Sequence, residues 1–420
     1  MSASTITCFL LRHAMNCPAP LLSLEQALNI VCQNINPLEG VDKVHLNDAC
    51  GRILAEPLHA PADIPPFASS AMDGYALRAA EAGSAGGLRV AGTVYAGAPW
   101  QNRLAAGSCL RIFTGAPLPE DADAVIIQEN VKRGNDTIYC TTPVRAGDHV
   151  RPQGDEARRG ELMLSAGQRL GAESIGLIAS LGYAEVRVKP RPRVALLTTG
   201  NELCPLGEPL EPGKIYDSNR HLLNGLLAEQ GLEPLDLGIV PDDPECLKQT
   251  LRLVEAEADV IITTGGASVG EADWMRASVE AMGQVLFWQV AIKPGKPFLF
   301  GYIGKSVLMG LPGNPVAVAV TFRQLVLPGL LRLMGADIPE PLRIRARVTA
   351  PVRKQPGRTE FRRAFLWSDE QGELRVSAQR KQGSHQLTGY TGANSFIVLE
   401  ADSAGAEEGD SVSVELLHYP

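Results

Sequence analysis

The chain of 420 residues is poor in aromatic side chains, which make up 5% of it, and has no excess of basic residues. Its 39 lysines and arginines are outnumbered by 47 aspartates and glutamates, which gives a formal net charge of −8. This balance argues against a nucleic-acid-binding protein, because such proteins present a net basic surface to phosphates. Any site for an anionic ligand must therefore be local. No apolar run approaches the length of a membrane span.

The eight cysteines include no Cys-x-x-Cys pair, and the seven histidines include no His-Glu-x-x-His motif. A zinc site is therefore not expected, and reduced thiols in a cytoplasmic protein are the simplest interpretation of the scattered cysteines. Residues 1–21 contain a short apolar patch, but they lack the basic stretch and the cleavage site of a signal peptide. We expect them to form a flexible N-terminal extension.

Glycine and proline are abundant, with 42 and 30 residues, which indicates many tight turns. The most informative turn follows a β-branched run that begins at Val260. There the sequence continues Thr-Thr-Gly-Gly-Ala-Ser-Val-Gly and soon reaches Asp273. Backbone N–H groups at the start of the next helix can bind an anion. The stretch lacks the lysine of a P-loop and closes on the acidic residue Asp273 instead. It therefore predicts an anionic ligand, with the Asp273 carboxylate and a metal ion nearby.

The first half of the chain combines helical and β patterns. Residues 23–34 have helical spacing with Ser23 as the cap, and residues 158–180 return to a helical pattern. Short β-rich runs with glycine and proline turns lie between them. Among these, residues 125–128 and 137–140 give a hairpin signal.

The second half predicts strand–helix units over residues 194–334, which imply a parallel sheet with helices on both faces. The fold class is therefore α/β plus β. A central doubly wound α/β domain is joined by an inserted small β domain, a helical linker domain and a C-terminal β-barrel-like domain. The expected boundaries are 1–21 for the extension, 22–59 with 150–190 for the helical linker domain, 60–149 for the inserted β domain, 191–336 for the α/β domain and 337–420 for the C-terminal domain.

Polar and glycine-rich segments follow the predicted strands of the α/β domain. In such sheets, ligands bind where these segments meet, at the carboxyl ends of the strands. The combination suits a phosphorylated substrate held by lysines and backbone amides, with a divalent cation on oxygen ligands. The segments are Thr198–Glu202, Asp242–Asp243, residues 264–268, residues 311–315 and the Lys-Pro-Gly-Lys-Pro loop of Lys293 and Lys296.

Each of these residues also has a purely structural interpretation. Asp243 precedes Pro244 and so fits the cap of a helix. Glu202 alone fits a solvated loop, and Lys293 and Lys296 fit an ordinary surface pair. Only the convergence of all of them on one edge of the sheet favours a functional site.

Five short motifs are the most specific features of the sequence. They are Ser-Ala-Met-Asp-Gly-Tyr at 70–75, Arg-Ile-Phe-Thr-Gly-Ala at 111–116, the glycine-rich stretch before Asp273, Lys-Pro-Gly-Lys-Pro at 293–297 and Leu-Pro-Gly-Asn-Pro at 311–315. From about Leu24 to the C-terminus, the chain resembles the MoeA family of molybdopterin molybdenumtransferases, which is related to the E domain of gephyrin. The α/β segment alone is MogA-like, since it also resembles molybdopterin adenylyltransferases of the MogA type.

The resemblance implies an enzyme of molybdenum cofactor biosynthesis with adenylylated molybdopterin and molybdate as substrates and Mg²⁺ as cofactor. Cleavage of the adenylate releases AMP, and molybdenum is placed on the dithiolene sulfurs. The resemblance also implies a homodimer with a site built between subunits, and transient contact with a molybdopterin adenylyltransferase, but no nucleic acid and no membrane. The implied catalytic residues are Asp73, Thr114, Glu202, Asp242 and Asp273, of which Asp242 and Asp273 hold the metal. The implied substrate-binding residues are Gly265, Gly266, Ser268, Lys293, Lys296, Pro297, Asn314, Arg358 and Ser384.

The chain departs from the family pattern at two places. Ala68 stands where the family usually has an acidic residue, and the family's Gly-x-Asp turn reads Gly154-Asp155-Glu156 here.

Two other functions remain open from the sequence. One is adenylylation of molybdopterin, and the other is a scaffold that binds partner peptides, like the gephyrin E domain. The intact carboxylate set argues against a purely structural role.

Overall fold

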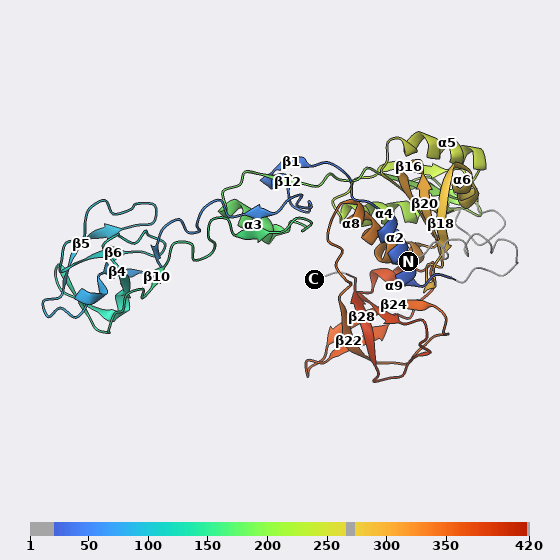
Figure 1. Ribbon diagram of the computed structural model, residues 1–420. Coiled ribbons are helices and arrows are strands. Elements are labelled where there is room, and N and C mark those ends of the chain that lie inside the picture. Colours follow the sequence, from blue (N-terminus) through green and yellow to red (C-terminus); the bar gives the residue numbers. More distant parts are fainter. Residues whose placement is uncertain (1–20, 266–273, 418–420) are drawn as a thin grey trace, which may run out of the picture. The chain divides into compact units, whose positions relative to one another are not determined.

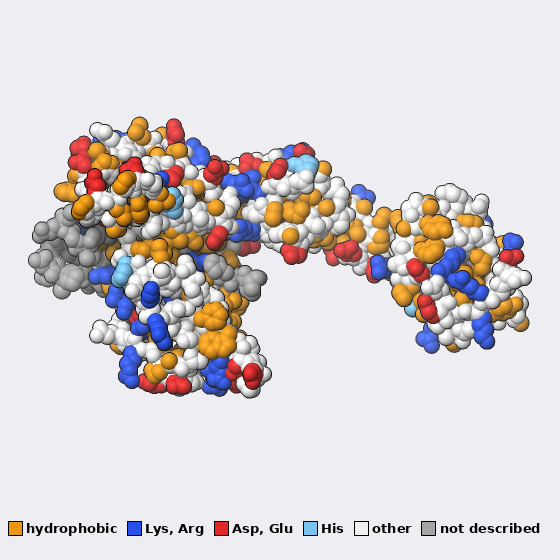
Figure 2. Space-filling model, turned by 180° about the vertical axis from the view of Figure 1, so that it is seen from behind, with side chains coloured by type: hydrophobic (Ala, Val, Ile, Leu, Met, Phe, Trp, Pro, Cys, Tyr) orange, Lys and Arg blue, Asp and Glu red, His pale blue; other side chains and the backbone are white. Residues whose placement is uncertain are grey.

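The computed structural model describes residues 21–265 and 274–417, which form two compact units (Figure 1). The main unit consists of Met1–Asp42, Gly51–Ile53 and Lys189–Pro420, and the insertion unit consists of Lys43–Cys50 and Leu54–Val188. On the face shown in Figure 2, acidic and basic side chains are interspersed on both units. The net negative charge of the chain is therefore not gathered in a single patch on that face.

The insertion unit contains a six-stranded sheet in the order β7-β4-β6-β5-β9-β8. Gly74 in this sheet has no room for a side chain, because an added Cβ would lie 2.0 Å from the carbonyl oxygen of Ile126. This close approach explains the glycine of the Ser-Ala-Met-Asp-Gly-Tyr motif. The strands are β4 Gly74–Leu77, β5 Leu88–Val94, β6 Ser108–Ile112, β7 Ala124–Ile127, β8 Val131–Arg133 and β9 Thr137–Cys140.

The hairpin in this sheet differs from the predicted one. Residues 137–140 form β9 as expected, but β9 pairs with β8, whereas β7 pairs with β4. A 3₁₀ turn, η4 Gln128–Asn130, separates β7 from β8 and redirects the chain. The sequence signal located the turn at residues 133–136, which overlap the observed turn, but it assigned the wrong partner strand to β9.

The remainder of the insertion unit has less helix than the sequence pattern predicts. Of residues 158–180, only α3 Ala172–Ser180 is helical, and β11 Leu162–Leu164 is a strand. Gly160 and Gly167 both have φ of 86°, a left-handed conformation that interrupts a helix. Short strand pairs and two 3₁₀ turns complete the unit: β1 Asp42–His45 with β12 Glu185–Val188, β2 Leu58–His59 with β11, β3 Ser69–Ser70 with β10 Val150–Arg151, η2 Leu46–Asp48 and η3 Ala79–Glu81.

The main unit is built on a six-stranded sheet in the order β16-β13-β17-β21-β20-β18. Leu196 packs in one hydrophobic cluster with Leu223, whereas the neighbouring Leu197 packs in another with Leu247 and Met275. Alternate residues thus face helices on opposite sides, which confirms the predicted doubly wound α/β domain. The elements are β13 Val194–Thr199, β16 Leu235–Val240, β17 Val260–Thr264, β18 Gly283–Gln289, β20 Pro297–Ile303, β21 Ser306–Leu311, α4 Ser218–Ala228, α5 Pro244–Glu255 and α6 Trp274–Met282. A small parallel pair, β14 Leu203–Cys204 and β15 Ile215–Tyr216, follows β13.

The expected parallel sheet has an antiparallel edge that the sequence pattern did not indicate. Strands β16, β13, β17 and β21 are parallel, but β20 pairs antiparallel with β21 and with β18. Only Gly304 and Lys305 connect β20 to β21, and Gly304 has φ of 56°. So short a connection can make a hairpin but cannot make a parallel crossover.

The first helix, α2 Leu24–Asn34, begins at the predicted cap, Ser23, which forms a capping box with Gln26. Its buried residues Ala27 and Val31 belong to the hydrophobic cluster of the α/β sheet. The expected boundaries grouped this helix with residues 150–190. In the structure it packs instead on the main unit, against α8 Leu327–Leu333.

A continuous helical stretch over Pro315–Leu333 corrects the expectation about apolar length. It consists of α7 Pro315–Thr321, the π-helical turn η5 Phe322–Val326 and α8, and it is long and apolar enough to cross a membrane. Of this stretch, 72% is buried inside the unit. Its side chains share a cluster with the sheet and α4, so it acts as a core helix.

The C-terminal segment closes into a five-stranded barrel in the order β24-β25-β22-β28-β26, since β26 also pairs with β24. Ala346, Ala364 and Ile397 alternate inward and fill its core. The predicted barrel-like domain is confirmed. Its elements are β22 Arg343–Val348, β23 Val352–Arg353, β24 Thr359–Ser368, β25 Leu374–Ala378, α9 Thr388–Thr391, β26 Ser395–Leu399, β27 Gly405–Ala406 and β28 Ser411–Leu416.

The π-helical turn places Gln324 against the barrel, where its Nε2 donates to Glu415 Oε1 at 2.6 Å. Glu415 Oε2 is buried without a hydrogen-bond partner, because Arg343 Nε lies 3.8 Å away. Burial raises the pKa of Glu415, and Gln324 and two arginines offset only part of that rise. The folded chain therefore disfavours the ionised form of this carboxyl group.

Glu415→Gln is expected to stabilise the chain at neutral pH by about 1 kcal/mol, since it removes a buried charge with an unpaired oxygen. A folded-state pKa above the unfolded value means that Glu415 contributes stability below the unfolded pKa and loses it as pH rises through the folded pKa. The advantage of Glu415→Gln should thus vanish near pH 4. Urea unfolding at both pH values measures it, and an equal or larger advantage at acid pH would contradict the assignment.

Candidate functional site

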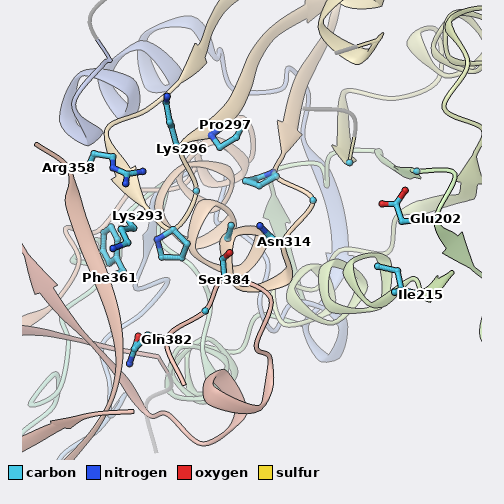
Figure 3. Close-up of a pocket in the computed structure, with 18 of the residues that line it drawn as sticks. Glu202, Ile215, Lys293, Lys296, Pro297, Asn314, Arg358, Phe361, Gln382 and Ser384 are labelled. Carbon is cyan, nitrogen blue, oxygen red and sulfur yellow. The ribbon is translucent and has the colours of Figure 1, made fainter. Parts of the chain in front are cut away.

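The predicted functional edge of the sheet borders a pocket of about 840 Å³ in the main unit. The segments after β13, β16, β17 and β21 reach it because these strands are parallel. β20 runs the other way, so the loop before it starts at the same edge. The barrel supplies the remaining wall with Arg358, Glu360 and Ser384. Figure 3 shows Lys293, Lys296 and Arg358 at one end of the pocket and Glu202 at the other, with Asn314 and Ser384 between them.

Two glycines let the backbone approach the pocket. Gly265, directly after β17, has φ of 86°, and an added Cβ would lie 2.0 Å from the carbonyl oxygen of Thr199. Gly200, after β13, has φ of 152°, and a Cβ there would meet the Glu202 carboxylate at 2.8 Å. A larger residue at Gly265 would push the strand ends apart, and one at Gly200 would displace the Glu202 side chain. The predicted role of the glycine-rich segments therefore has a geometric basis at these two positions.

The carboxylate end of the pocket contains Glu202 and Asp242. The backbone N–H of Asp242 donates to Asn201 Oδ1 at 3.4 Å, which holds the segment after β16 against the segment after β13. Within residues 21–265 and 274–417, buried Asp242 Oδ1 has no hydrogen-bond partner. Burial, and then the charge of Glu202, raises the pKa of Asp242. Two carboxylates that repel each other around an unpaired buried oxygen form an arrangement that a cation would stabilise. Asp243 is the cap of α5, as its alternative interpretation predicted.

The cationic end joins the sheet to the barrel. β19 Ile292–Lys293 pairs in parallel with Thr359 and Glu360 of β24, so the lysine loop is fixed to the barrel strand. Lys293 Nζ lies 3.5 Å from Glu360 Oε1, and Arg362 Nε lies 2.7 Å from the same oxygen. Lys293 is thus partly neutralised.

Lys296 and Arg358 differ from Lys293, because within residues 21–265 and 274–417 neither has an ion-pair partner. Both are half-buried and line the pocket. Gly295 between the two lysines has φ of 113°, and a Cβ there would meet Thr321 Cγ2 at 2.7 Å. The tight loop therefore brings Lys296 and the adjacent Pro297 to the pocket wall, and these unpaired cations are suited to an oxyanion.

Ser384 is held by a residue that the sequence did not single out. Arg363 on β24 is 1% exposed, and its guanidinium donates to the carbonyls of Gly383 and Gln386 at 3.1 and 3.0 Å. Burial lowers its pKa. The Ser384 carbonyl also accepts the N–H of Val316 at 2.9 Å, which ties the loop to the start of α7. Arg363 is therefore a positioning residue for the loop that carries Ser384.

We expect Arg363→Met to lower the free energy of unfolding by about 3 kcal/mol, because two half-buried carbonyls lose charged donors. Arg353→Met is the matched control, since the Arg353 side chain is 83% exposed on the same barrel. Its change should stay within about 0.5 kcal/mol. Equal stability losses in the two variants would contradict the role of Arg363.

Asp73 and Thr114 lie in the insertion unit, where they contact each other. Asp73 Oδ1 accepts both the N–H and the hydroxyl of Thr114, each at 2.8 Å. These two donors lower the pKa of Asp73. The structure thus brings two residues that lie 41 positions apart into contact within the insertion unit.

The other predicted positions are placed as follows. Asn314 caps α7 without a side-chain hydrogen bond and faces the pocket (Figure 3). Ala68 contributes only its carbonyl, to Leu118 N–H, and Gly154 begins a tight turn with φ of 71°. Gly266, Ser268 and Asp273 lie outside the described residues. Among the described residues, no group of three or more His, Cys, Asp or Glu side chains is arranged to hold a metal ion.

Three family models match successive parts of the chain. Residues 22–182 match the MoeA N-terminal region (domain I and II), residues 195–332 match a probable molybdopterin binding domain, and residues 345–417 match the MoeA C-terminal region (domain IV). A molybdopterin molybdenumtransferase of Haemophilus influenzae is 39% identical over 401 residues, which cover 95% of this chain and 99% of that protein. The chain belongs to the molybdopterin molybdenumtransferase family. This enzyme family acts in molybdenum cofactor biosynthesis, and the resemblance seen in the motifs is confirmed.

Further members agree over nearly the whole length. The molybdopterin molybdenumtransferase of Bacillus subtilis is 33% identical and covers 94% of both chains. A crystal structure of the molybdopterin biosynthesis moeA protein from Pyrococcus horikoshii is 32% identical, with a TM-score of 0.81 over 94% of this chain and all of that one. The family's sequence and fold thus extend over the insertion unit, the α/β domain and the barrel.

Proposed function

We propose that this chain transfers molybdenum from molybdate to adenylylated molybdopterin, with Mg²⁺ assisting the release of AMP. The observation that carries the proposal is that one pocket has unpaired cations at one end and a repelling pair of carboxylates at the other. The cationic end suits an oxyanion, and the carboxylate end suits a cation bound to phosphates. A substrate with a phosphoanhydride near its metal-accepting sulfurs would span both ends.

At the cationic end, Lys296 and Arg358 would bind molybdate as substrate, with the Ser384 hydroxyl as a further donor. Charge-assisted hydrogen bonds are about twice as strong as neutral ones and orient a small tetrahedral dianion. Lys293 would contribute less, because Glu360 competes for it. Asn314 and Pro297 would line the path between the two ends of the pocket.

The residues at the carboxylate end fit Mg²⁺. In the part of the chain that the structure describes, Asp242 Oδ1 is a buried oxygen without a donor, and burial and then the charge of Glu202 raise the pKa of Asp242. Oxygen ligands of this kind are those that Mg²⁺ prefers. When bound, Mg²⁺ neutralises charge on the phosphate oxygens as AMP leaves. Asp242 and Glu202 would hold it, and we propose Asp273 as a further ligand on the sequence motif alone.

The main rival is adenylylation of molybdopterin, and the α/β domain alone does not exclude it. The purified chain is given either preformed adenylylated molybdopterin with molybdate, or molybdopterin with ATP. The transferase proposal predicts AMP and active cofactor from the first mixture and no nucleotide consumption in the second. Pyrophosphate release from ATP would support the rival. A scaffold without enzymatic activity would give neither product.

We also propose a cytoplasmic homodimer, which receives its substrate by transient contact with a molybdopterin adenylyltransferase. The support is the family resemblance, together with the separation of Asp73 and Thr114 from the pocket residues along the chain. If one site uses residues from two subunits, Asp73→Ala and Asp242→Ala homodimers should both be weak. A mixed dimer with one substitution per subunit should regain about half of the wild-type activity, by two-site counting. A folded mixed dimer as inactive as its parents would contradict sharing.

A further inference from the structure

A second, smaller cavity of about 60 Å³ opens from the carboxylate end of the pocket. The two cavities share wall residues, among them Glu202, Ile215 and Gly265. Figure 3 shows Glu202 and Ile215 at the end of the pocket away from the lysines. A volume of this size corresponds to about two water molecules at roughly 30 Å³ each. The side cavity therefore has room for two small polar groups but not for a ring.

The walls of the side cavity present two polar atoms without partners. Thr199 is 2% exposed, and its hydroxyl is buried with no hydrogen bond within the described residues. Asn219 Oδ1 is also buried and has no donor among the residues that the structure describes. A Cβ on Gly265 would lie 3.2 Å from Thr199 Oγ1, so the glycine keeps this hydroxyl accessible from the main pocket. Unpaired buried polar atoms are costly, which favours a ligand that pairs with them.

Asn219 cannot turn away from the cavity, because its Nδ2 is used elsewhere. Nδ2 donates to Thr264 Oγ1 at 3.1 Å and to the Gly313 carbonyl at 2.7 Å. Thr264 in turn donates to the Pro312 carbonyl at 2.8 Å. The amide is thus fixed between the ends of β17 and β21, and its Oδ1 remains an acceptor. The cavity is therefore suited to a ligand with two adjacent polar groups, at least one of which is a hydrogen-bond donor.

We propose that Thr199 and Asn219 bind the two ribose hydroxyls of the adenylate. This inference rests on the proposed function, in which AMP is the leaving group. The ribose is attached directly to the phosphate, so phosphates at Glu202 and Asp242 would put the sugar next to the side cavity. A cis-diol offers two donors in the volume of about two waters, and acceptor side chains bind ribose hydroxyls in other nucleotide sites. Thr199 and Asn219 then distinguish a ribonucleotide from its deoxy analogues.

The test compares the binding of AMP, 2′-deoxy-AMP and 3′-deoxy-AMP to the full chain with Mg²⁺, by titration calorimetry. AMP should bind about tenfold more tightly than each deoxy analogue, since one buried hydrogen bond is worth up to about 1.5 kcal/mol. Thr199→Val removes the hydroxyl at nearly constant volume and should reduce this preference to about twofold for one of the two analogues. Thr199→Ser keeps the hydroxyl and should retain the preference.

Thr250→Val is the matched control, because the Thr250 hydroxyl bonds to the Cys246 carbonyl on α5, away from both cavities. Its preference should equal that of the wild type. Asn219→Asp keeps the acceptor oxygen and should also retain discrimination, even if the tie to Gly313 weakens. Equal affinity of the wild-type chain for all three nucleotides, or no binding of AMP, would overturn the inference and leave the side cavity to water. AMP release during turnover would still stand in that case, so the two failures are distinguishable.

Discussion

Asp242→Asn is expected to lower the rate of AMP release about 100-fold or more, because even residues that only support a metal ligand cost up to about 100-fold when replaced, while the chain stays at least as stable as before. Among the described residues the buried Oδ1 of Asp242 has no donor, and burial, followed by repulsion from the charge of Glu202, raises the pKa of Asp242. Removing the negative charge relieves that repulsion, so the fold loses nothing. The cation that needs the charge loses a ligand. Few substitutions are expected to separate activity from stability so clearly.

Asp243→Asn is the matched control for Asp242→Asn. The Asp243 side chain caps α5 by accepting the N–H groups of Glu245 and Cys246 at 3.0 and 2.9 Å. Asparagine caps helices about as well as aspartate, so turnover and stability should change little. Initial rates of AMP release at several Mg²⁺ concentrations, together with thermal unfolding, give both quantities. If the Asp242→Asn variant turned over at the wild-type rate at low Mg²⁺, this result would contradict the proposed role of Asp242 as a metal ligand.

Lys296→Ala and Arg358→Ala should each raise the molybdate concentration for half-maximal activity by about tenfold or more. Each removes a charge-assisted hydrogen bond, which is worth about 1.5–3 kcal/mol. Neither side chain has an ion-pair partner among the described residues, so its loss leaves no stranded carboxylate. The free energy of unfolding should therefore change by less than about 1 kcal/mol.

Lys305→Ala is the control for the two cation variants. Lys305 lies in the turn between β20 and β21, at the opposite end of these strands from the Lys293–Pro297 loop. Its removal changes the net charge of the chain by the same amount, but not the charge in the pocket. A molybdate dependence that shifts equally in all three variants would indicate a general electrostatic effect and would contradict a specific oxyanion site.

The main features of the fold could be read from the sequence because they depend on local periodicity. The alternation of Leu196 and Leu197 between two cores, and the caps at Ser23 and Asp243, are local signals that the structure reproduces. Strand partners are non-local, which explains why β9 was assigned to the wrong neighbour. The position of α2 on the main unit also depends on a distant surface, the helix α8.

The candidate site shows the same difference between features with a local sequence signal and features that depend on distant partners. Glycines and charged residues at strand ends are visible in the sequence, and the parallel order of the strands brings them to one edge. Arg363 and Asn219 had no such signal, because their roles come from partners far along the chain, at Gly383 and Gly313. A buried arginine in a β-strand gives no local pattern that separates it from an exposed one. The contact of Lys293 with Glu360 was likewise not predicted, because Glu360 lies on a strand of the barrel, far along the chain.

A single-turnover assay tests the central claim most directly, namely that one pocket couples molybdate binding to release of AMP. Chain in excess is mixed with adenylylated molybdopterin and Mg²⁺, with and without molybdate, and both AMP and dithiolene-bound molybdenum are counted. The account predicts one AMP for each molybdenum inserted, with insertion lost in Asp242→Asn, Lys296→Ala and Arg358→Ala in proportion to their kinetic defects. Molybdenum insertion at the wild-type rate in those three variants, or insertion without any AMP, would contradict it.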